Sequence, residues 1–272
     1  MIKKALLLSF ILLATTVCFA SKVDTIQVQS KAMNKIIKNV IILPDDYQPS
    51  KTYPVVYLLH GATGNYSDWV KKGPVVKKLA DTYQFVIVCP DGGFNSWYWD
   101  SPVDNSYKYE TFVAEELPAY IDSHYATIKD KSGRAITGLS MGGHGALYLA
   151  FRHQDLFGAA GSMSGGVDIR PFPNNWDIAK RLGSLEQNPE TWDKYTVVNM
   201  VGLLKNSSLK LIFDCGVNDF FYNVNVNLHN ELLEMKYPHD FIVRPGVHNW
   251  TYWNNAVKYQ FLFFNIFFNK TE

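Results

Sequence analysis

The sequence has little cysteine and almost no excess of charge of either sign. Only 3 of its 272 residues are cysteine, and 26 Lys and Arg stand against 25 Asp and Glu, for a formal net charge of +1. The basic residues are interspersed with acidic ones, so the chain lacks the basic patch of a nucleic-acid-binding protein. It also lacks internal repeats, low-complexity segments and the closely spaced Cys and His that hold zinc. We therefore expect no metal, no cofactor and no nucleic-acid partner.

The N-terminus has the pattern of a secretory signal peptide. Two lysines precede an apolar run over 5–14, and small residues lead to a cleavage position after Ala20. A membrane anchor is the alternative, but the run is short for a span of about 20 residues. We therefore expect a signal peptide over 1–20 and a secreted or periplasmic mature protein over 21–272, without stable membrane association after cleavage.

Two cysteines lie beyond this segment, Cys89 and Cys215, and each ends an apolar run of strand length. An exported protein invites a disulfide. Cysteines at the ends of buried strands are more typical of free thiols in a core, so we expect two buried free thiols.

Apolar runs of strand length alternate with stretches of helix length along the rest of the chain. Alternating polar and apolar residues over 24–30 and 35–43 predict an antiparallel pair at a sheet edge. Continuous apolar runs predict further strands at 53–59, 85–89, 134–139, 157–163, 209–215 and 240–244. Helices are expected at 69–83, 110–124, 141–153, 223–236 and 252–268. The alternation predicts a single α/β domain, with a mostly parallel central sheet of about eight strands and helices on both faces.

Two segments depart from this rhythm. Residues 165–208 carry prolines, asparagines and short helical patches, and we expect them to cover one end of the sheet rather than to form a second domain. Such covers often shape a substrate pocket. The strongly aromatic stretch 259–268 is expected to pack on the sheet as a terminal helix, because it lacks the basic face of a membrane-surface segment.

The most specific motif of the chain is a G-x-S-x-G over 138–142, centred on Ser140. An apolar stretch precedes it and helix-forming residues follow, which is the strand–turn–helix context that presents a nucleophilic serine. Side chains two positions before and after the serine would collide across so sharp a turn, which explains Gly138 and Gly142. Ser140 is therefore the expected nucleophile.

A nucleophilic serine needs a histidine to take its proton and a carboxylate to orient that histidine. In α/β-hydrolases the three follow in the order serine, acid, histidine, on loops at the carboxyl ends of strands. Of the seven histidines only His248 satisfies both constraints, because it comes just after the last expected strand. The expected acid is Asp219, which follows the strand at 209–215; Asp168, after the preceding strand, is the alternative.

The remaining site residues are expected in loops near the nucleophile. The developing oxyanion needs two backbone N–H donors, which we assign to Met141 and to Ala62 in a glycine-rich loop. Aromatic rings suit planar aromatic acids and sugar faces. The expected substrate-binding residues are His60, Trp97, Trp99 and Trp176. For Trp176 and Trp192 in the covering segment, simple packing in the core is an equally open alternative.

Together these motifs resemble the esterase D-like α/β-hydrolases, a group that includes feruloyl esterases, tributyrin esterases, S-formylglutathione hydrolases and mycolyltransferases. The resemblance extends over about residues 25–268 and rests on the segments 58–64, 90–93, 96–98, 138–143, 214–219 and 246–250. It implies the same nucleophile, acid, base and oxyanion amides as the order and spacing above. Val247 stands where the family often has glycine, next to the expected base.

The resulting expectation is a secreted serine carboxylesterase that acts through an acyl-enzyme on feruloyl or acetyl esters of carbohydrates. Its substrate would be a small-molecule or polysaccharide-linked ester. S-formylglutathione is disfavoured because that substrate is cytosolic. Two alternatives of other classes are an acyltransferase, with the same triad and a sugar hydroxyl as acceptor, and a non-catalytic carbohydrate-binding descendant.

Overall fold

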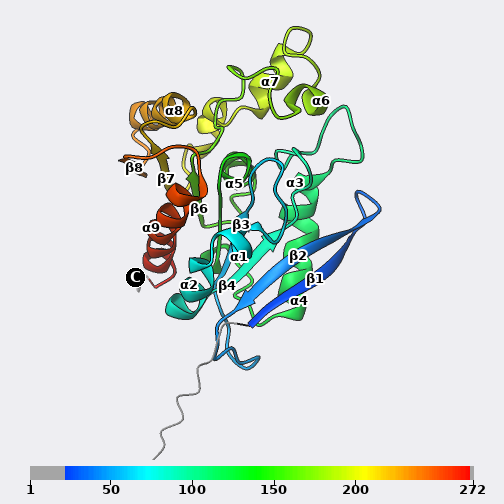
Figure 1. The fold of residues 1–272 in the computed structure, drawn as a ribbon, viewed down its shortest axis with the longest axis vertical. Coiled ribbons are helices and arrows are strands. Elements are labelled where there is room, and N and C mark those ends of the chain that lie inside the picture. Colours follow the sequence, from blue (N-terminus) through cyan, green and yellow to red (C-terminus); the bar gives the residue numbers. More distant parts are fainter. Residues whose placement is uncertain (1–21, 270–272) are drawn as a thin grey trace, which may run out of the picture.

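The computed structural model describes residues 22–269, so the predicted signal peptide over 1–20 lies outside the described residues. An eight-stranded sheet runs through this part of the chain in the order β1-β2-β4-β3-β5-β6-β7-β8 (Figure 1). The strands are β1 (Lys22–Ser30), β2 (Lys35–Leu43), β3 (Val55–Leu59), β4 (Val86–Pro90), β5 (Arg134–Gly138), β6 (Ala159–Met163), β7 (Lys210–Gly216) and β8 (Asp240–Arg244). β1 and β2 are antiparallel at one edge, and all pairs from β4 to β8 are parallel. The predicted mostly parallel α/β sheet is therefore confirmed.

Helices cover both faces of the sheet. They are α1 (Asp68–Lys72), α2 (Val75–Tyr83), α3 (Tyr109–Thr111), α4 (Leu117–His124), α5 (Met141–Arg152), α6 (Ile178–Leu182), α7 (Pro189–Tyr195), α8 (Tyr222–Glu234) and α9 (Trp250–Phe268). Alternate residues of β3 enter different cores: Tyr57 belongs to the core that holds residues of α4, α5 and α8, and Leu58 to the core that holds residues of α2 and α9. A strand buried on both faces has no polar side to show, which explains its continuous apolar sequence. None of the helices in residues 22–269 is both long and apolar enough to span a bilayer.

Two of the expected helices are interrupted. The stretch 69–83 divides into α1 and α2, because Gly73 caps the first helix and Pro74 precedes the second. The stretch 110–124 contains a π-helical turn over Phe112–Glu116 between α3 and α4. Pro118 has no N–H to donate back into that turn, and such a gap in the hydrogen-bond ladder is a common cause of a local change in helix pitch.

The segment 165–208 lies beyond the carboxyl ends of the strands and carries α6, α7 and a 3₁₀ helix over Val197–Leu204 (Figure 1). Its Trp192 is fully buried and donates from Nε1 to the carbonyl of Gly183 at 2.9 Å, so this tryptophan packs in the core. On the other face of the sheet, Phe261 and Phe264 of α9 are buried. The prediction of free, buried thiols at Cys89 and Cys215 is confirmed.

One buried carboxyl makes the stability of the fold depend on pH. Asp214 of β7 is fully buried; its Oδ2 accepts from Gln260 Nε2 at 3.1 Å, and its Oδ1 has no partner among the described residues. Burial raises its pKa from 3.8 to about 6, against the opposing effects of Gln260 and Arg244. The folded state therefore binds this proton more tightly than the unfolded chain does, and the stability this contributes is lost as the pH rises through about 6.

We expect Asp214→Asn to abolish this loss, because its neutral amide cannot ionise. At about 1.4 kcal/mol per pKa unit, the shift from 3.8 to about 6 corresponds to about 3 kcal/mol. Between about pH 4 and pH 7 the unfolding free energy of the parent should therefore fall by about 3 kcal/mol relative to that of the variant. Urea unfolding curves across this pH range measure it, and a difference that stays constant with pH would contradict the assignment.

Candidate active site

Ser140 lies on a strained turn between β5 and α5. Its backbone has φ 55° and ψ −118°, a conformation that a residue with a side chain rarely adopts. A Cβ on Gly138 would lie 2.6 Å from the backbone of Gly142, and one on Gly142 would lie 2.5 Å from the carbonyl oxygen of His60. Both glycines are therefore needed for the turn to close, as the motif predicts.

The structure brings the predicted triad into one hydrogen-bonded line. His248 Nε2 lies 2.9 Å from Ser140 Oγ, although 108 positions separate the two residues. On the other side of the ring, His248 Nδ1 lies 2.8 and 3.0 Å from the two carboxylate oxygens of Asp219. A carboxylate at Nδ1 keeps the proton on that nitrogen and leaves Nε2 to accept from the serine hydroxyl. The groups are thus arranged for the serine to lose its proton to the ring.

The alternative acid does not reach this histidine. Asp168 forms an ion pair with Arg170, whose Nη2 lies 2.8 Å from the Asp168 Oδ2. Asp219, by contrast, has a fully buried carboxylate that also accepts from the backbone N–H of Phe221 at 2.9 Å. That second donor holds the carboxylate in place against the ring.

The two predicted oxyanion donors lie at the start of α5 and in the loop after β3. Met141 begins α5, so its N–H is free of the helical ladder and lies at the positive end of the helix dipole. Ala62 lies in a turn closed by a hydrogen bond from Gly64 N to Gly61 O at 3.1 Å. A Cβ on Gly61 would lie 3.3 Å from the Cβ of Ser140, which shows how closely this turn approaches the nucleophile. Within residues 22–269 neither N–H donates to a protein acceptor.

A cavity of about 400 Å³ opens beside Ser140 and His248. Aromatic side chains form much of its wall: Trp176, Phe220, Trp250 and Trp253. Trp176 and Phe220 are stacked with ring centroids 5.7 Å apart, and the Phe220 ring lies 4.3 Å from the ring of His248.

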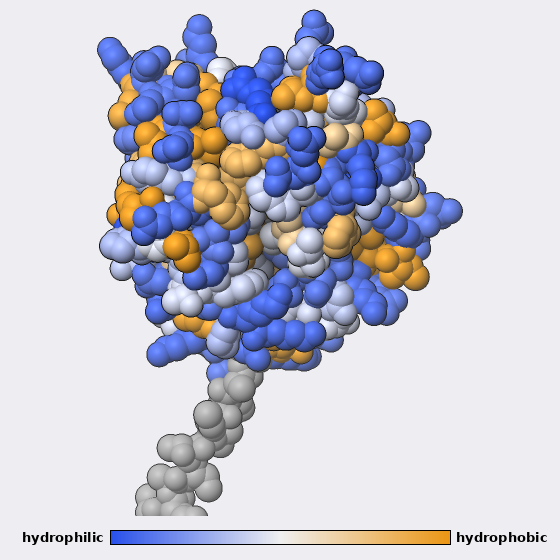
Figure 2. Space-filling view, turned by 45° about the horizontal axis from the view of Figure 1, so that its top comes forward, coloured by the Kyte–Doolittle hydropathy of each residue, from blue (hydrophilic) through white to orange (hydrophobic). Residues whose placement is uncertain are grey.

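The cavity wall also has a polar part, with a 3.1 Å ion pair between Lys72 and Asp68, and Lys72 Nζ lies 5.6 Å from the centroid of the Trp250 ring. Figure 2, in which the end of the molecule with α6 and α7 is turned forward, shows hydrophobic side chains in separate patches among hydrophilic ones. The cavity therefore combines flat apolar faces with a charged pair, beside the reactive groups.

Three of the predicted substrate contacts are wrong. The side chains of His60, Trp97 and Trp99 are each at most 1% exposed and do not line the cavity. Trp99 donates from Nε1 to His144 Nε2 at 2.9 Å, and Trp97 stacks on Trp99 at 5.5 Å. The sequence places these residues after a strand end but does not show which way they face. Trp176 does line the cavity, and its contact with substrate stays a prediction.

His60 instead braces the loops beside the nucleophile. Its Nδ1–H donates to the carbonyl of Gly61 at 2.8 Å, and its Nε2 accepts from the N–H of Gly92 at 2.8 Å. Only a neutral imidazole can do both, and burial lowers the pKa of His60 in agreement with this role. Burial likewise lowers the pKa of His144 to about 4.

Sequence reasoning missed the other aromatic and charged residues of the cavity wall, Phe220, Trp250, Trp253, Asp68 and Lys72. Phe220 directly follows the predicted acid and Trp250 comes two positions after the predicted base, so adjacency to catalytic loops was the available signal. For metal binding, no group of three or more His, Cys, Asp or Glu is placed as ligands in the part of the chain that the structure describes.

Comparison with known proteins agrees with this geometry. A family model described as "Putative esterase" matches residues 30–264. The chain belongs to this esterase family. The predicted resemblance to the esterase D-like α/β-hydrolases is thereby confirmed, and a ferulic acid esterase of known structure superposes with a TM-score of 0.78 at 33% identity, covering 92% of this chain and 100% of that one.

Relatives known by sequence include Esterase Rv1288 of Mycobacterium tuberculosis and an acetyl esterase of Caldicellulosiruptor saccharolyticus. The first is 37% identical over 134 residues, 48% of this chain, and the match spans only 29% of its own length. The second is 28% identical over 255 residues, which cover 84% of this chain and 92% of the relative.

Proposed function

We propose that this member of the esterase family is a serine carboxylesterase that cleaves its substrate through an acyl-enzyme on Ser140. The observation that carries the proposal is the unbroken line from the serine hydroxyl through His248 to the buried Asp219. The strained backbone at Ser140 supports it further, because a protein that only bound carbohydrate would have no use for such a turn.

In the proposed mechanism, His248 Nε2 takes the proton of Ser140 as its oxygen attacks the ester carbonyl. The resulting oxyanion accepts from the N–H groups of Ala62 and Met141, and the dipole of α5 favours the same negative charge. Asp219 stabilises the imidazolium, which then passes its proton to the departing alcohol. Water, deprotonated by the same ring, attacks the acyl group and releases the acid and the free serine.

We propose carbohydrate-linked feruloyl or acetyl esters as substrates. The parallel rings of Trp176 and Phe220 offer faces to a planar aromatic acid or a sugar ring, and the cavity of about 400 Å³ is in the range of small-molecule sites. The ion pair of Asp68 and Lys72 supplies hydrogen-bonding groups for hydroxyls. The names of a ferulic acid esterase and an acetyl esterase among the relatives support the same class. The N-terminal pattern supports a secreted or periplasmic location, where such polymers would be met.

A panel of esters tests this proposal. The purified protein is assayed with p-nitrophenyl acetate, methyl ferulate, a feruloylated arabinose and acetylated xylan, with and without an acceptor sugar, and is labelled with a fluorophosphonate. We expect hydrolysis of several of these esters and covalent labelling of the peptide that contains Ser140. Absence of both turnover and labelling would reject the enzyme assignment, and acyl products that form on the acceptor sugar would identify an acyltransferase instead.

A further inference from the structure

We propose that Asn95 is a positioning residue for the reaction: its side-chain amide fixes the oxyanion turn, Gly61 to Gly64, and ties it to the aromatic wall of the cavity. The inference rests on the proposed esterase function, since it assigns to this turn the stabilisation of the oxyanion. Asn95 does not touch the cavity. It acts through Thr63, the neighbour of Ala62.

The amide of Asn95 joins two separate segments. Its Oδ1 accepts from the backbone N–H of Thr63 at 3.1 Å, and its Nδ2 donates to Asp177 Oδ2 at 3.2 Å. A donor on one side and a carboxylate on the other admit only this orientation of the amide. The residue is 4% exposed, so water does not readily substitute for either partner. Asparagine also tolerates the backbone φ of +49° found here better than most residues do.

The oxyanion turn needs such a partner because its backbone is strained. Thr63 has a φ of +60°, which a β-branched residue rarely adopts. It stands at the third position of a turn closed by Gly64 N and Gly61 O, where glycine or asparagine is normally required for a positive φ. The hydrogen bond from the Thr63 N–H to Asn95 Oδ1 stabilises the peptide between Ala62 and Thr63 in the orientation that the strained turn requires. The peptide directly after the Ala62 donor is thereby held in place.

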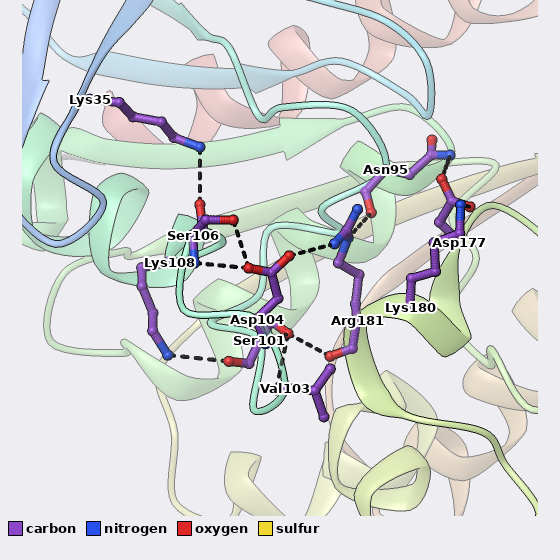
Figure 3. A network of polar contacts seen from close by, with 10 residues as sticks. All are labelled: Lys35, Asn95, Ser101, Val103, Asp104, Ser106, Lys108, Asp177, Lys180 and Arg181. Atoms are coloured by element: carbon purple, nitrogen blue, oxygen red, sulfur yellow. Dashed lines mark hydrogen bonds and ion pairs between the residues drawn. The ribbon is translucent and has the colours of Figure 1, made fainter.

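Asn95 is itself anchored in a polar network with α6 (Figure 3). Arg181 of α6 donates from Nε to the Asn95 carbonyl at 3.4 Å and from Nη1 to Asp104 at 3.1 Å. The guanidinium also stacks over the ring of Tyr107 at 3.5 Å, and the carbonyl of Arg181 accepts from Ser101 Oγ at 2.6 Å. This network fastens the covering segment to the loop between β4 and α3.

The same loop holds the cavity wall. Trp97 Nε1 donates to the carbonyl of Trp176, whose ring lines the cavity, and Trp176 directly precedes Asp177. The oxyanion turn and the Trp176 wall therefore meet at one amide, that of Asn95. A displaced donor weakens the transition state more than the bound ester, so the predicted effect is on kcat rather than on KM.

The test uses substitutions at both ends of the amide. Asn95→Ala removes both contacts, and we expect kcat for p-nitrophenyl acetate to fall by about 30-fold, less than the 10²–10³ seen when an oxyanion donor is removed outright. KM should change by less than about threefold, and a trifluoromethyl ketone that mimics the oxyanion should lose affinity in step with kcat. Asn95→Asp keeps the acceptor for Thr63 but opposes Asp177, so its kcat should fall by about tenfold.

The double variant Asn95→Asp with Asp177→Asn exchanges donor and acceptor and should recover kcat to within about threefold of the parent. Asn199→Ala removes an exposed side-chain amide that donates only to Asp193, outside this network, and serves as the control with unchanged kcat. Unchanged kcat in the two single Asn95 variants, or equal loss in the control, would overturn the inference. If Asn95→Ala does not fold, failure of the double variant to recover from Asn95→Asp would also overturn it. An inactive parent protein would instead reject the proposed function.

Discussion

Replacing Ser140 by alanine is expected to lower kcat for p-nitrophenyl acetate by about 10⁶-fold, the scale seen when the nucleophile of a serine hydrolase is removed. The hydroxyl supplies the attacking oxygen, and no other side chain lies 2.9 Å from His248 Nε2 in the described structure to take its place. The turn itself should survive, because its strain is held by backbone bonds from Ser140 N to Met163 O and from Gly142 N to Leu139 O. The oxyanion amides alone should leave a residual rate about 10³-fold above water.

Steady-state kinetics and fluorophosphonate labelling measure this effect. The matched control is Ser123→Ala, which removes an exposed hydroxyl bonded only to groups of its own helix, and should leave kcat unchanged. Turnover by the Ser140 variant within about tenfold of the parent would show that another residue is the nucleophile.

Asp219→Asn is expected to lower kcat by about 10⁴-fold while leaving the fold intact. His248 Nδ1 lies against both carboxylate oxygens, and Oδ1 also accepts from the N–H of Phe221. In the variant, an amide whose oxygen stays with Phe221 places its NH₂ where Oδ2 accepts from the ring. If its NH₂ faces the ring, the imidazole must carry its proton on Nε2, where it cannot accept from Ser140. A neutral amide also fails to stabilise the imidazolium that forms during attack.

Asp168→Asn is the paired control, since Asp168 follows the preceding strand and is bound to Arg170 instead of the catalytic histidine. Its kcat should stay within about twofold of the parent. A larger loss in Asp168→Asn than in Asp219→Asn would reverse the assignment of the acid. Thermal unfolding of both variants separates an effect on catalysis from an effect on stability.

The parts of the fold that could be predicted are those in which one physical requirement acts on a continuous stretch of sequence. A central strand such as β3 is buried on both faces, and only an unbroken apolar run satisfies that condition. The sharp turn at Ser140 is recognisable from two glycines at fixed spacing, because the backbones approach so closely there that no larger residue fits. The π-helical turn before α4 has a weaker signal, since a proline near the start of a helix is also compatible with an ordinary first turn.

The candidate site was predictable only where chain order constrains it. His248 follows from its position after the last strand, but whether a tryptophan faces a cavity or the core depends on neighbours far away in sequence. Trp97 and Trp99 are buried against α5, whereas Trp176 lines the cavity, and all three lie in similar polar loops. The side chain of Asn95 contacts residues 32 and 82 positions away in the sequence, and the residues next to Asn95 in the chain do not predict these contacts.

The two buried thiols have a practical consequence. Cys89 and Cys215 lie in β4 and β7, and burial raises the pKa of both, so neither is reactive while the sheet is closed. An alkylating reagent added to the native protein should modify them only when the surrounding strands open, and at a rate that reports that opening. The alkylation rates of Cys89 and Cys215, measured by mass spectrometry, would therefore report local unfolding separately in the two halves of the sheet. No engineered cysteine would be needed.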